Sequence, residues 1–152
     1  MKNKSMQKNG QLLLDNQLCF ALYSSSLAMT QLYKPLLDAV GLTYTQYLVM
    51  LVLWEADAIS LKEIATRLGQ QSGALTPVIK RLEADGLVLR VRSAKDERQL
   101  NIQLTDRGQG LRQAAKQINL CIAEQCGLAI PDVIDLKVKL DLLRNKLQKS
   151  IK

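Results

Sequence analysis

The feature that most constrains this chain is a change of hydrophobic period within residues 60–104. Up to Gly86 the apolar residues recur at helical spacing, and beyond it they recur at every second position, as in a half-buried strand. The residues SLKE at 60–63 have the pattern of a capping box, in which a serine hydroxyl and a glutamate carboxylate each satisfy a free backbone N–H. A helix should therefore begin there. Gly69 predicts its end, because a residue without a β-carbon enters the left-handed conformation at little cost.

The residues after Gly69 predict a second helix followed by a hairpin. The helix is expected from about residue 72 to 85, or from Thr76 if Pro77 marks its first turn, and its apolar stripe is Leu75, Val78, Ile79 and Leu82. Two alternating runs, 87–92 and 99–104, flank a polar loop and predict two paired strands. Their dry face is expected to carry Leu87, Leu89, Val91, Leu100, Ile102 and Leu104.

A helix, a turn, a second helix and a hairpin, in this order, predict a winged helix-turn-helix. Such a module places its second helix in the major groove of DNA. The alternative is a small helical domain whose hairpin only closes the core. We expect a mainly α fold with a small β-hairpin wing, in which the winged helix-turn-helix covers residues 60–104 and helical dimerisation arms cover 15–58 and 105–152. Residues 15–152 would form a single domain behind a flexible N-terminus, residues 1–14.

Four helices are expected in the two arms. The first should run over about residues 15–39, with Asp15 or Asn16 as its N-cap and a kink or interruption at Pro35. A second capping box, TYTQ at 43–46, predicts a helix to about residue 56. Thr105 should cap a helix to about residue 126, and a last helix is expected over 131–151. That last helix carries an apolar stripe close to a heptad seam: Val133, Leu136, Leu140, Leu143 and Leu147.

Composition narrows the classes of function. The chain has 152 residues, a net charge of +7, three cysteines and no histidine. The missing histidine excludes imidazole-based acid–base catalysis and zinc sites that need imidazole, and we expect no metal and no cofactor. The N-terminus lacks the apolar stretch of a secretory leader, and no run is long enough to span a bilayer. We therefore expect a cytoplasmic protein with reduced cysteines and no membrane partner.

A cysteine near the start of the first helix is a candidate reactive group. Free backbone amides and the positive helix end favour a thiolate at Cys19. The alternative is a small buried hydrophobic residue. Tyr33 follows fourteen residues later, about 21 Å along a helix, so it cannot contact Cys19 of its own chain. If two first helices pair antiparallel in a dimer, Tyr33 of one copy would approach Cys19 of the other, and Tyr44 and Tyr47 could pack at the same place.

These residues resemble the organic hydroperoxide resistance regulators, a branch of the MarR transcription factors. The resemblance covers about residues 15–115 and rests on the segments LCFALYS at 18–24, YKPLL at 33–37, GLTY at 41–44, SG at 72–73, LTP at 75–77 and DER at 96–98. It implies a homodimeric repressor that binds a palindromic operator and releases it when its sensing cysteine is oxidised by an organic hydroperoxide. By that resemblance Cys19 is the sensing cysteine, and Tyr33 and Tyr44 are its hydrogen-bond partners.

The resemblance also implies further site residues. In one subgroup of the family the sulfenic acid is captured by a cysteine of the other subunit, which makes Cys121 and Cys126 the candidate resolving cysteines, with Cys121 slightly preferred. Alternatively, both cysteines only pack within a dimerisation helix and have no redox role. Geometry and resemblance together predict DNA contacts from the second helix and the wing. The candidates are Ser72, Gly73, Thr76, Lys80, Arg81, Arg92, Lys95, Asp96 and Arg98, with Asp96 orienting Arg98.

Three other functions stay open at this point. A MarR-type repressor can instead be controlled by a small phenolic or aromatic ligand held between the arms and the DNA-binding lobes. A thiol peroxidase is a different class, disfavoured because no arginine lies within four residues of Cys19. The last is a winged-helix module that binds protein and not DNA. A steep fall of duplex affinity with salt would argue against that module.

Overall fold

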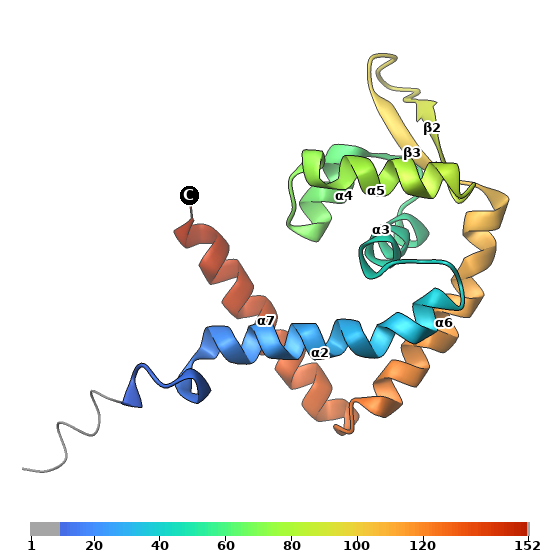
Figure 1. Cartoon of the computed structure of the whole chain (residues 1–152). Coiled ribbons are helices and arrows are strands. Elements are labelled where there is room, and N and C mark those ends of the chain that lie inside the picture. The colour runs from blue at the N-terminus through green and yellow to red at the C-terminus, as the bar shows by residue number, and fades with distance from the viewer. Residues whose placement is uncertain (1–9, 152) are drawn as a thin grey trace, which may run out of the picture. The chain divides into compact units, whose positions relative to one another are not determined.

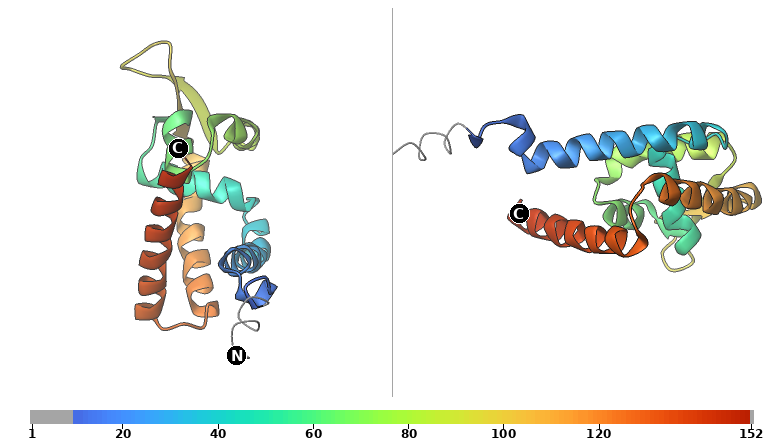
Figure 2. Two further views of the ribbon diagram at one scale, coloured as in Figure 1. Left: turned by 90° about the vertical axis from the view of Figure 1, so that its left-hand side faces the viewer. Right: turned by 90° about the horizontal axis from the view of Figure 1, so that it is seen from below.

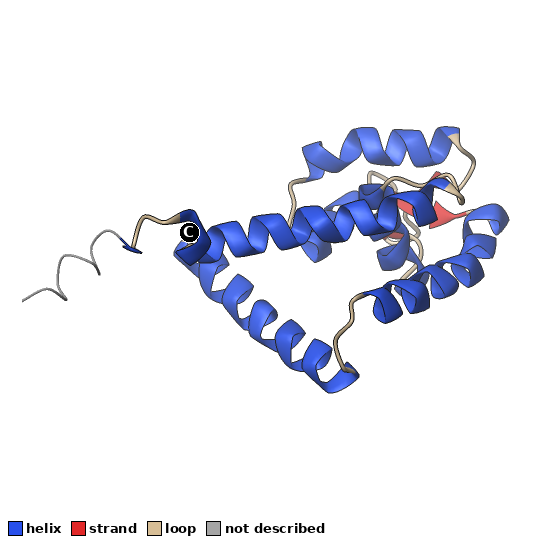
Figure 3. Ribbon diagram, turned by 60° about the horizontal axis from the view of Figure 1, so that its bottom comes forward, coloured by secondary structure: helices blue, strands red, loops and turns tan. Residues whose placement is uncertain are grey.

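The computed structural model describes residues 10–151, which form helices and one small sheet (Figures 1 and 3). The helices are a 3-10 turn η1 (Leu14–Asn16), α2 (Leu18–Asp38), α3 (Tyr44–Glu55), α4 (Leu61–Leu68), α5 (Ser72–Ala84), α6 (Asp106–Gln125) and α7 (Ile130–Ser150). The strands are β1 (Ile59–Ser60), β2 (Val88–Arg92) and β3 (Leu100–Leu104). The mainly α fold with a wing is confirmed.

The chain divides into two compact units, one ending at residue 118 and one beginning at residue 119. The first holds the sheet and helices α2 to α5, and the second holds α7. In the part that the structure describes, no helix combines the length and the apolar character needed to cross a membrane. Of the expected N-terminal segment, residues 1–9 lie outside the described residues, and residues 10–14 lead into η1.

Both predicted capping boxes are present. Thr43 N–H donates to Gln46 Oε1 at 2.8 Å and Thr43 Oγ1 accepts from Gln46 N–H at 3.3 Å, which starts α3. Ser60 and Glu63 do the same at the start of α4. Gly69 ends α4 at φ 65°, where Gln70 N–H closes back on Ala65 O. Local side-chain chemistry therefore sets where these two helices begin, as the sequence predicts.

The start of the first long helix was predicted wrongly. Asp15 and Asn16 lie in η1, and α2 begins only at Leu18, with Gln17 as an N-cap that forms no side-chain cap bond. The Asn16 and Gln17 amides instead donate to Gly10 O and Leu13 O, so they close the preceding turn. Pro35 also does not interrupt the helix, which runs on to Asp38 (Figure 2). It lies in the last turn, where it removes one N–H donor.

The sheet contains one strand more than predicted. β1 pairs with β3 and β3 with β2, all antiparallel, in the order β1-β3-β2. Asn101 donates from its side chain to Ala58 O at 2.7 Å, and Asp57 Oδ1 accepts from Leu104 N–H at 2.8 Å. These bonds fasten residues 57–60 to the wing. Two residues are too short for a periodic signal, so the sequence did not reveal β1.

The predicted dry face of the hairpin needs correction. Val88 lies opposite Leu104, Arg90 opposite Ile102 and Arg92 opposite Leu100. Because residues directly opposite share a face, the apolar side of β3 lies with Val88, Arg90 and Arg92, and not with Leu89 and Val91. Leu89 and Leu100 are exposed, by 39% and 48%. The loop fixes this register, since Ser93 N–H donates to Gln99 O at 2.8 Å and Gln99 N–H to Asp96 O at 2.9 Å.

A close junction joins the start of α6 to the end of α5 and to α3. Trp54 is buried in the core, and its Nε1–H donates to Gly108 O at 3.0 Å. Thr105 caps α6 as predicted, accepting from Gly108 N–H at 3.1 Å, and its hydroxyl donates to Gly86 O at 2.6 Å. Arg107 donates to Asp85 O at 3.0 Å. Side chains at the start of α6 thus donate to backbone carbonyls just after α5, and these bonds join the two helices that flank the wing.

Candidate cysteine site and nucleic-acid interface

Cys19 lies closer to the helix end than predicted. It is the second residue of α2 because that helix begins at Leu18, and its thiol is free and exposed. The first four backbone N–H groups of a helix have no intrahelical acceptor and carry the positive end of the helix dipole. The alternative of a buried hydrophobic cysteine therefore fails within this chain, and the sulfur is open to a reagent.

Three tyrosines form a cluster where α2 meets α3. The Tyr33 ring centroid lies 5.3 Å from that of Tyr44 and 5.4 Å from that of Tyr47, and the last two lie 6.4 Å apart. Tyr33 and Tyr47 are buried, and Tyr44 is half-buried. Burial, and secondarily the neighbouring Tyr47, raise the pKa of Tyr44. Its hydroxyl stays protonated at neutral pH and is available as a donor.

The predicted association of Cys19 with Tyr33 and Tyr44 is not made within one chain. Fourteen residues separate Cys19 from Tyr33 along the continuous α2, which corresponds to about 21 Å. Contact between these groups stays a prediction about two copies of the chain. Tyr23 was not singled out from the sequence. It follows Cys19 by one helical turn, so both lie on one face of α2.

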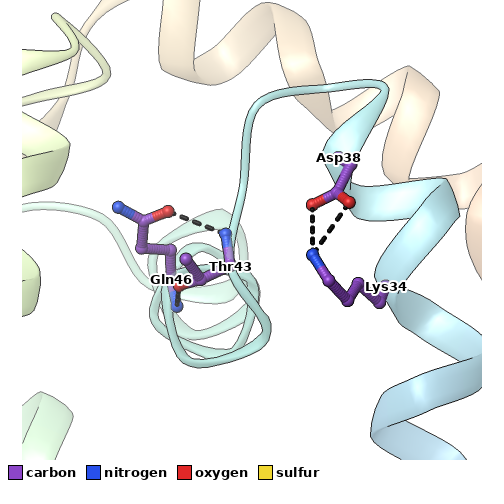
Figure 4. Close-up of polar contacts among 4 residues, drawn as sticks. All are labelled: Lys34, Asp38, Thr43 and Gln46. Atoms are coloured by element: carbon purple, nitrogen blue, oxygen red, sulfur yellow. Dashed lines mark hydrogen bonds and ion pairs between the residues drawn. The ribbon is translucent and has the colours of Figure 1, made fainter.

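A pocket of about 290 Å³ borders Tyr44. Leu37 and Leu42 supply part of its apolar lining, and an exposed ion pair between Lys34 Nζ and Asp38 Oδ2, at 3.0 Å, lies on the α2 side (Figure 4). The Thr43–Gln46 capping box of α3 lies close by in the same view.

The two remaining cysteines lie at the end of α6. Cys121 is half-buried, and its sulfur accepts from Gln125 Nε2 at 3.4 Å. Cys126 follows the last residue of α6 and is also half-buried and free. Both thiols are therefore unpaired in this structure and chemically available for oxidation.

The helix predicted to enter DNA begins at Ser72, so Pro77 lies inside it and Thr76 is not its first residue. Lys80 and Arg81 are exposed, and Arg81 Nε lies 3.4 Å from Asp85 Oδ2. A β-carbon built on Gly73 would meet nothing within 4 Å, which leaves this end of the helix open to a groove. Thr76 donates its hydroxyl to Ser72 O at 3.2 Å.

The wing presents a second group of cations. Arg92 donates to Glu97 O at 3.0 Å, and Lys95 and Arg98 are exposed. Asp96 Oδ1 accepts from the backbone N–H of Arg98 at 3.0 Å, so it orients the backbone of this residue. Arg90 Nε lies 3.4 Å from Glu83 Oε2 of α5, and its register places Arg90 opposite Ile102.

Comparison with known proteins identifies relatives of this arrangement. A family model described as transcriptional regulator SarA/Rot matches residues 31–115. The organic hydroperoxide resistance transcriptional regulator of Bacillus subtilis is 50% identical over 105 residues, which cover 69% of this chain and 71% of that protein. The regulator TtmR of Methylorubrum extorquens is 56% identical over 99 residues, 65% of this chain, and the match spans about half its length, 51%.

Solved structures agree with the sequence relatives. Reduced AbfR bound to DNA superposes with a TM-score of 0.77 at 38% identity, covering 94% of this chain and 98% of that one. AbfR, a protein of Staphylococcus epidermidis, is also known in a disulfide form, which matches with a TM-score of 0.65. The residues that the family model matches include α4, α5 and the wing. The chain belongs to the MarR/SarA family of transcriptional regulators, among relatives that include an organic hydroperoxide resistance regulator.

Proposed function

We propose that this chain is a homodimeric DNA-binding repressor that releases its operator when an organic hydroperoxide oxidises Cys19. The observation that carries the proposal is the exposed thiol in the first turn of α2. The chain that holds it is 50% identical, over 105 residues, to an organic hydroperoxide resistance regulator. AbfR, a structural neighbour, is known in a reduced form and an overoxidized form, both bound to DNA, and in a disulfide form, so DNA binding and redox chemistry occur together in a related protein.

The chemistry requires only the thiol and the peroxide. The Cys19 sulfur attacks the terminal oxygen of the hydroperoxide, a sulfur–oxygen bond forms and the oxygen–oxygen bond breaks. The thiol is oxidised to a sulfenic acid, and the peroxide is reduced to an alcohol that takes up the proton. Tyr33 and Tyr44 of a second copy would donate hydrogen bonds to the sulfur or the leaving oxygen. The raised pKa of Tyr44 keeps its phenol in the donor form.

A path from Cys19 to the DNA-binding helix runs through packed elements. The Tyr33 ring on α2 packs against the tilted rings of Tyr44 and Tyr47 on α3. Trp54, near the end of α3, donates to Gly108 O at the start of α6. A shift of α2 on oxidation would move α3 and the junction beside Gly86, where α5 ends. Both recognition helices of a dimer must fit the operator together, so a change in their spacing weakens the whole contact set.

The DNA contacts proposed for this function come from the start and exposed face of α5 and from the wing. They are Ser72, Gly73, Thr76, Lys80, Arg81, Arg92, Lys95, Asp96 and Arg98. A second proposed step is capture of the sulfenic acid by a thiol of the other subunit, Cys121 in preference to Cys126. A disulfide then forms and water leaves, as in the disulfide form known for AbfR.

Replacing Cys19 by serine tests the proposal. In vitro selection with the wild type gives the duplex that it binds most tightly. The C19S dimer should bind this duplex with the same affinity as the wild type. Cumene hydroperoxide should release the wild type, the C121S and the C126S variants from this duplex but leave C19S bound. Dithiothreitol should restore wild-type binding. If C19S is released as readily as the wild type, Cys19 is not the sensor.

Two measurements separate the proposal from other functions. A repressor controlled by a phenolic ligand would recover DNA binding on dialysis without a thiol, whereas the oxidised protein requires one. A thiol peroxidase would consume many equivalents of peroxide per subunit, whereas a sensor consumes about one before reduction. Non-reducing mass spectrometry of wild type, C121S and C126S would show which cysteine joins Cys19, since the corresponding disulfide disappears in that variant.

A further inference from the structure

An open trough of about 960 Å³ lies between α4 and the wing. Its floor is the face of the sheet turned away from the core, where Ser60 and Val91 lie opposite Asn101. One wall is the exposed face of α4 with Lys62 and Thr66, and the other is the wing loop. In the chain, α4 precedes the predicted recognition helix α5, and the wing follows α5. The two walls of the trough therefore come from the elements on either side of α5 in sequence.

The charge of the trough is predominantly positive. Lys62 stands on one wall, Arg92 and Lys95 stand on the other, and within residues 10–151 Lys62 forms no ion pair. The acidic residue of the lining, Glu63, already accepts from Ser60 N–H and from Ser60 Oγ, both at 2.8 Å. Its carboxylate is thus held against the helix end, where it caps α4. The lining also includes Arg67, which pairs with Glu55, so four cations and one acid line the trough.

We propose that this trough holds one sugar–phosphate strand of the DNA that flanks the operator, with Lys62 and Lys95 binding its phosphates from opposite walls. The inference rests on the DNA-binding function proposed above and adds a contact from α4 that the sequence did not indicate. The first helix of a helix-turn-helix crosses the DNA backbone, which brings α4 to a phosphate strand. Flexible lysines on open walls suit a strand that continues in both directions.

The form of the trough favours a strand over a small organic anion. Small-molecule sites enclose most of the ligand and present a few fixed polar groups. Here the cationic side chains are exposed, and the buried polar side chain of the floor, Ser60, is engaged in the capping box. The lining is therefore positively charged but open. Phosphate contacts that position DNA, without recognising its sequence, need a surface of this kind.

The test is the salt dependence of duplex binding by the full-length protein. We expect K62Q and K95Q each to reduce the slope of log affinity against log salt by about 0.9 per subunit, or about 1.8 per dimer. At 0.15 M salt this corresponds to a loss of affinity of about 5-fold per contact and about 30-fold per dimer. The loss should be equal for the selected duplex and for a random 30-base-pair duplex, since phosphates carry no sequence information.

Two further variants make the result specific. K62R keeps the charge and should keep the wild-type slope, and K116Q removes an exposed lysine from α6 and should leave the slope unchanged. A wild-type slope for K62Q and K95Q would overturn the inference while leaving DNA binding intact. The same result combined with loss of benzoate binding by calorimetry would assign the trough to a small anion. If the wild type itself shows no salt-dependent duplex binding, the proposed function fails first.

Discussion

Replacing Gly108 by alanine should destabilise the protein, whereas the same replacement at Gly110, two residues along α6, should stabilise it. A β-carbon built on Gly108 would lie 2.1 Å from Leu87 O, 3.0 Å from Leu87 C and 3.3 Å from Leu104 Cδ2. One built on Gly110 would meet nothing within 4 Å. The two positions share a helix and a chemical change, so they differ only in what surrounds the new methyl group.

The magnitudes follow from these contacts. Leu87 cannot easily withdraw, because its side chain is buried and its N–H donates to Leu82 O at 3.0 Å. Overpacking against such a backbone costs up to about 3 kcal/mol, and the higher helix propensity of alanine returns about 1 kcal/mol. The net loss for G108A is about 2 kcal/mol of unfolding free energy. For a chain of this length that lowers Tm by roughly 4–8 °C, while G110A should gain about 0.5–1 kcal/mol and roughly 1–4 °C.

Thermal unfolding of wild type, G108A and G110A, followed by circular dichroism at one protein concentration, measures both effects. The concentration must be equal because association shifts the apparent stability of a dimer. Urea unfolding gives the free-energy differences directly. A G108A protein as stable as G110A would contradict the close packing of α6 against the base of the wing.

Two further predictions concern pH. Hydrogen bonds from the backbone and then the side chain of Ser60, followed by the Lys95 charge, lower the pKa of Glu63, so its contribution to stability is present at neutral pH and is lost as pH falls through the lowered pKa. E63Q should therefore lose less stability than the wild type in urea unfolding between pH 6 and pH 3, and an equal loss would contradict the capping geometry. Burial raises the pKa of Tyr44 above 10.0, so the folded state holds this proton more tightly and loses stability as pH rises past that value. The difference between the absorbance titrations of wild type and Y44F near 295 nm should show the Tyr44 phenol ionising above its ordinary pKa, and a difference curve at or below that pKa would contradict the burial of this side chain.

Much of the fold depends on interactions between residues close in sequence, so the sequence alone predicted it. The capping boxes at Thr43 and Ser60, the stop at Gly69 and the alternation after Gly86 act within a few residues, where side chains satisfy their own backbone or set a period. The same applies to the recognition helix and to the thiol near the start of α2. The predicted N-cap of α2 was wrong because the side-chain amides of Asn16 and Gln17 donate to backbone carbonyls of the preceding turn and do not cap the helix.

Other features depend on contacts between distant residues, and only the folded chain decides them. The face on which Arg90 lies is set by strand register through the wing loop, so alternation alone assigned the wrong partners to Ile102 and Leu104. The Trp54–Gly108 bond and the cationic trough join segments far apart in sequence, and the tyrosine cluster joins two different helices, α2 and α3. Local patterns reveal periods and caps, whereas register, aromatic packing and shared surfaces depend on which elements meet in three dimensions.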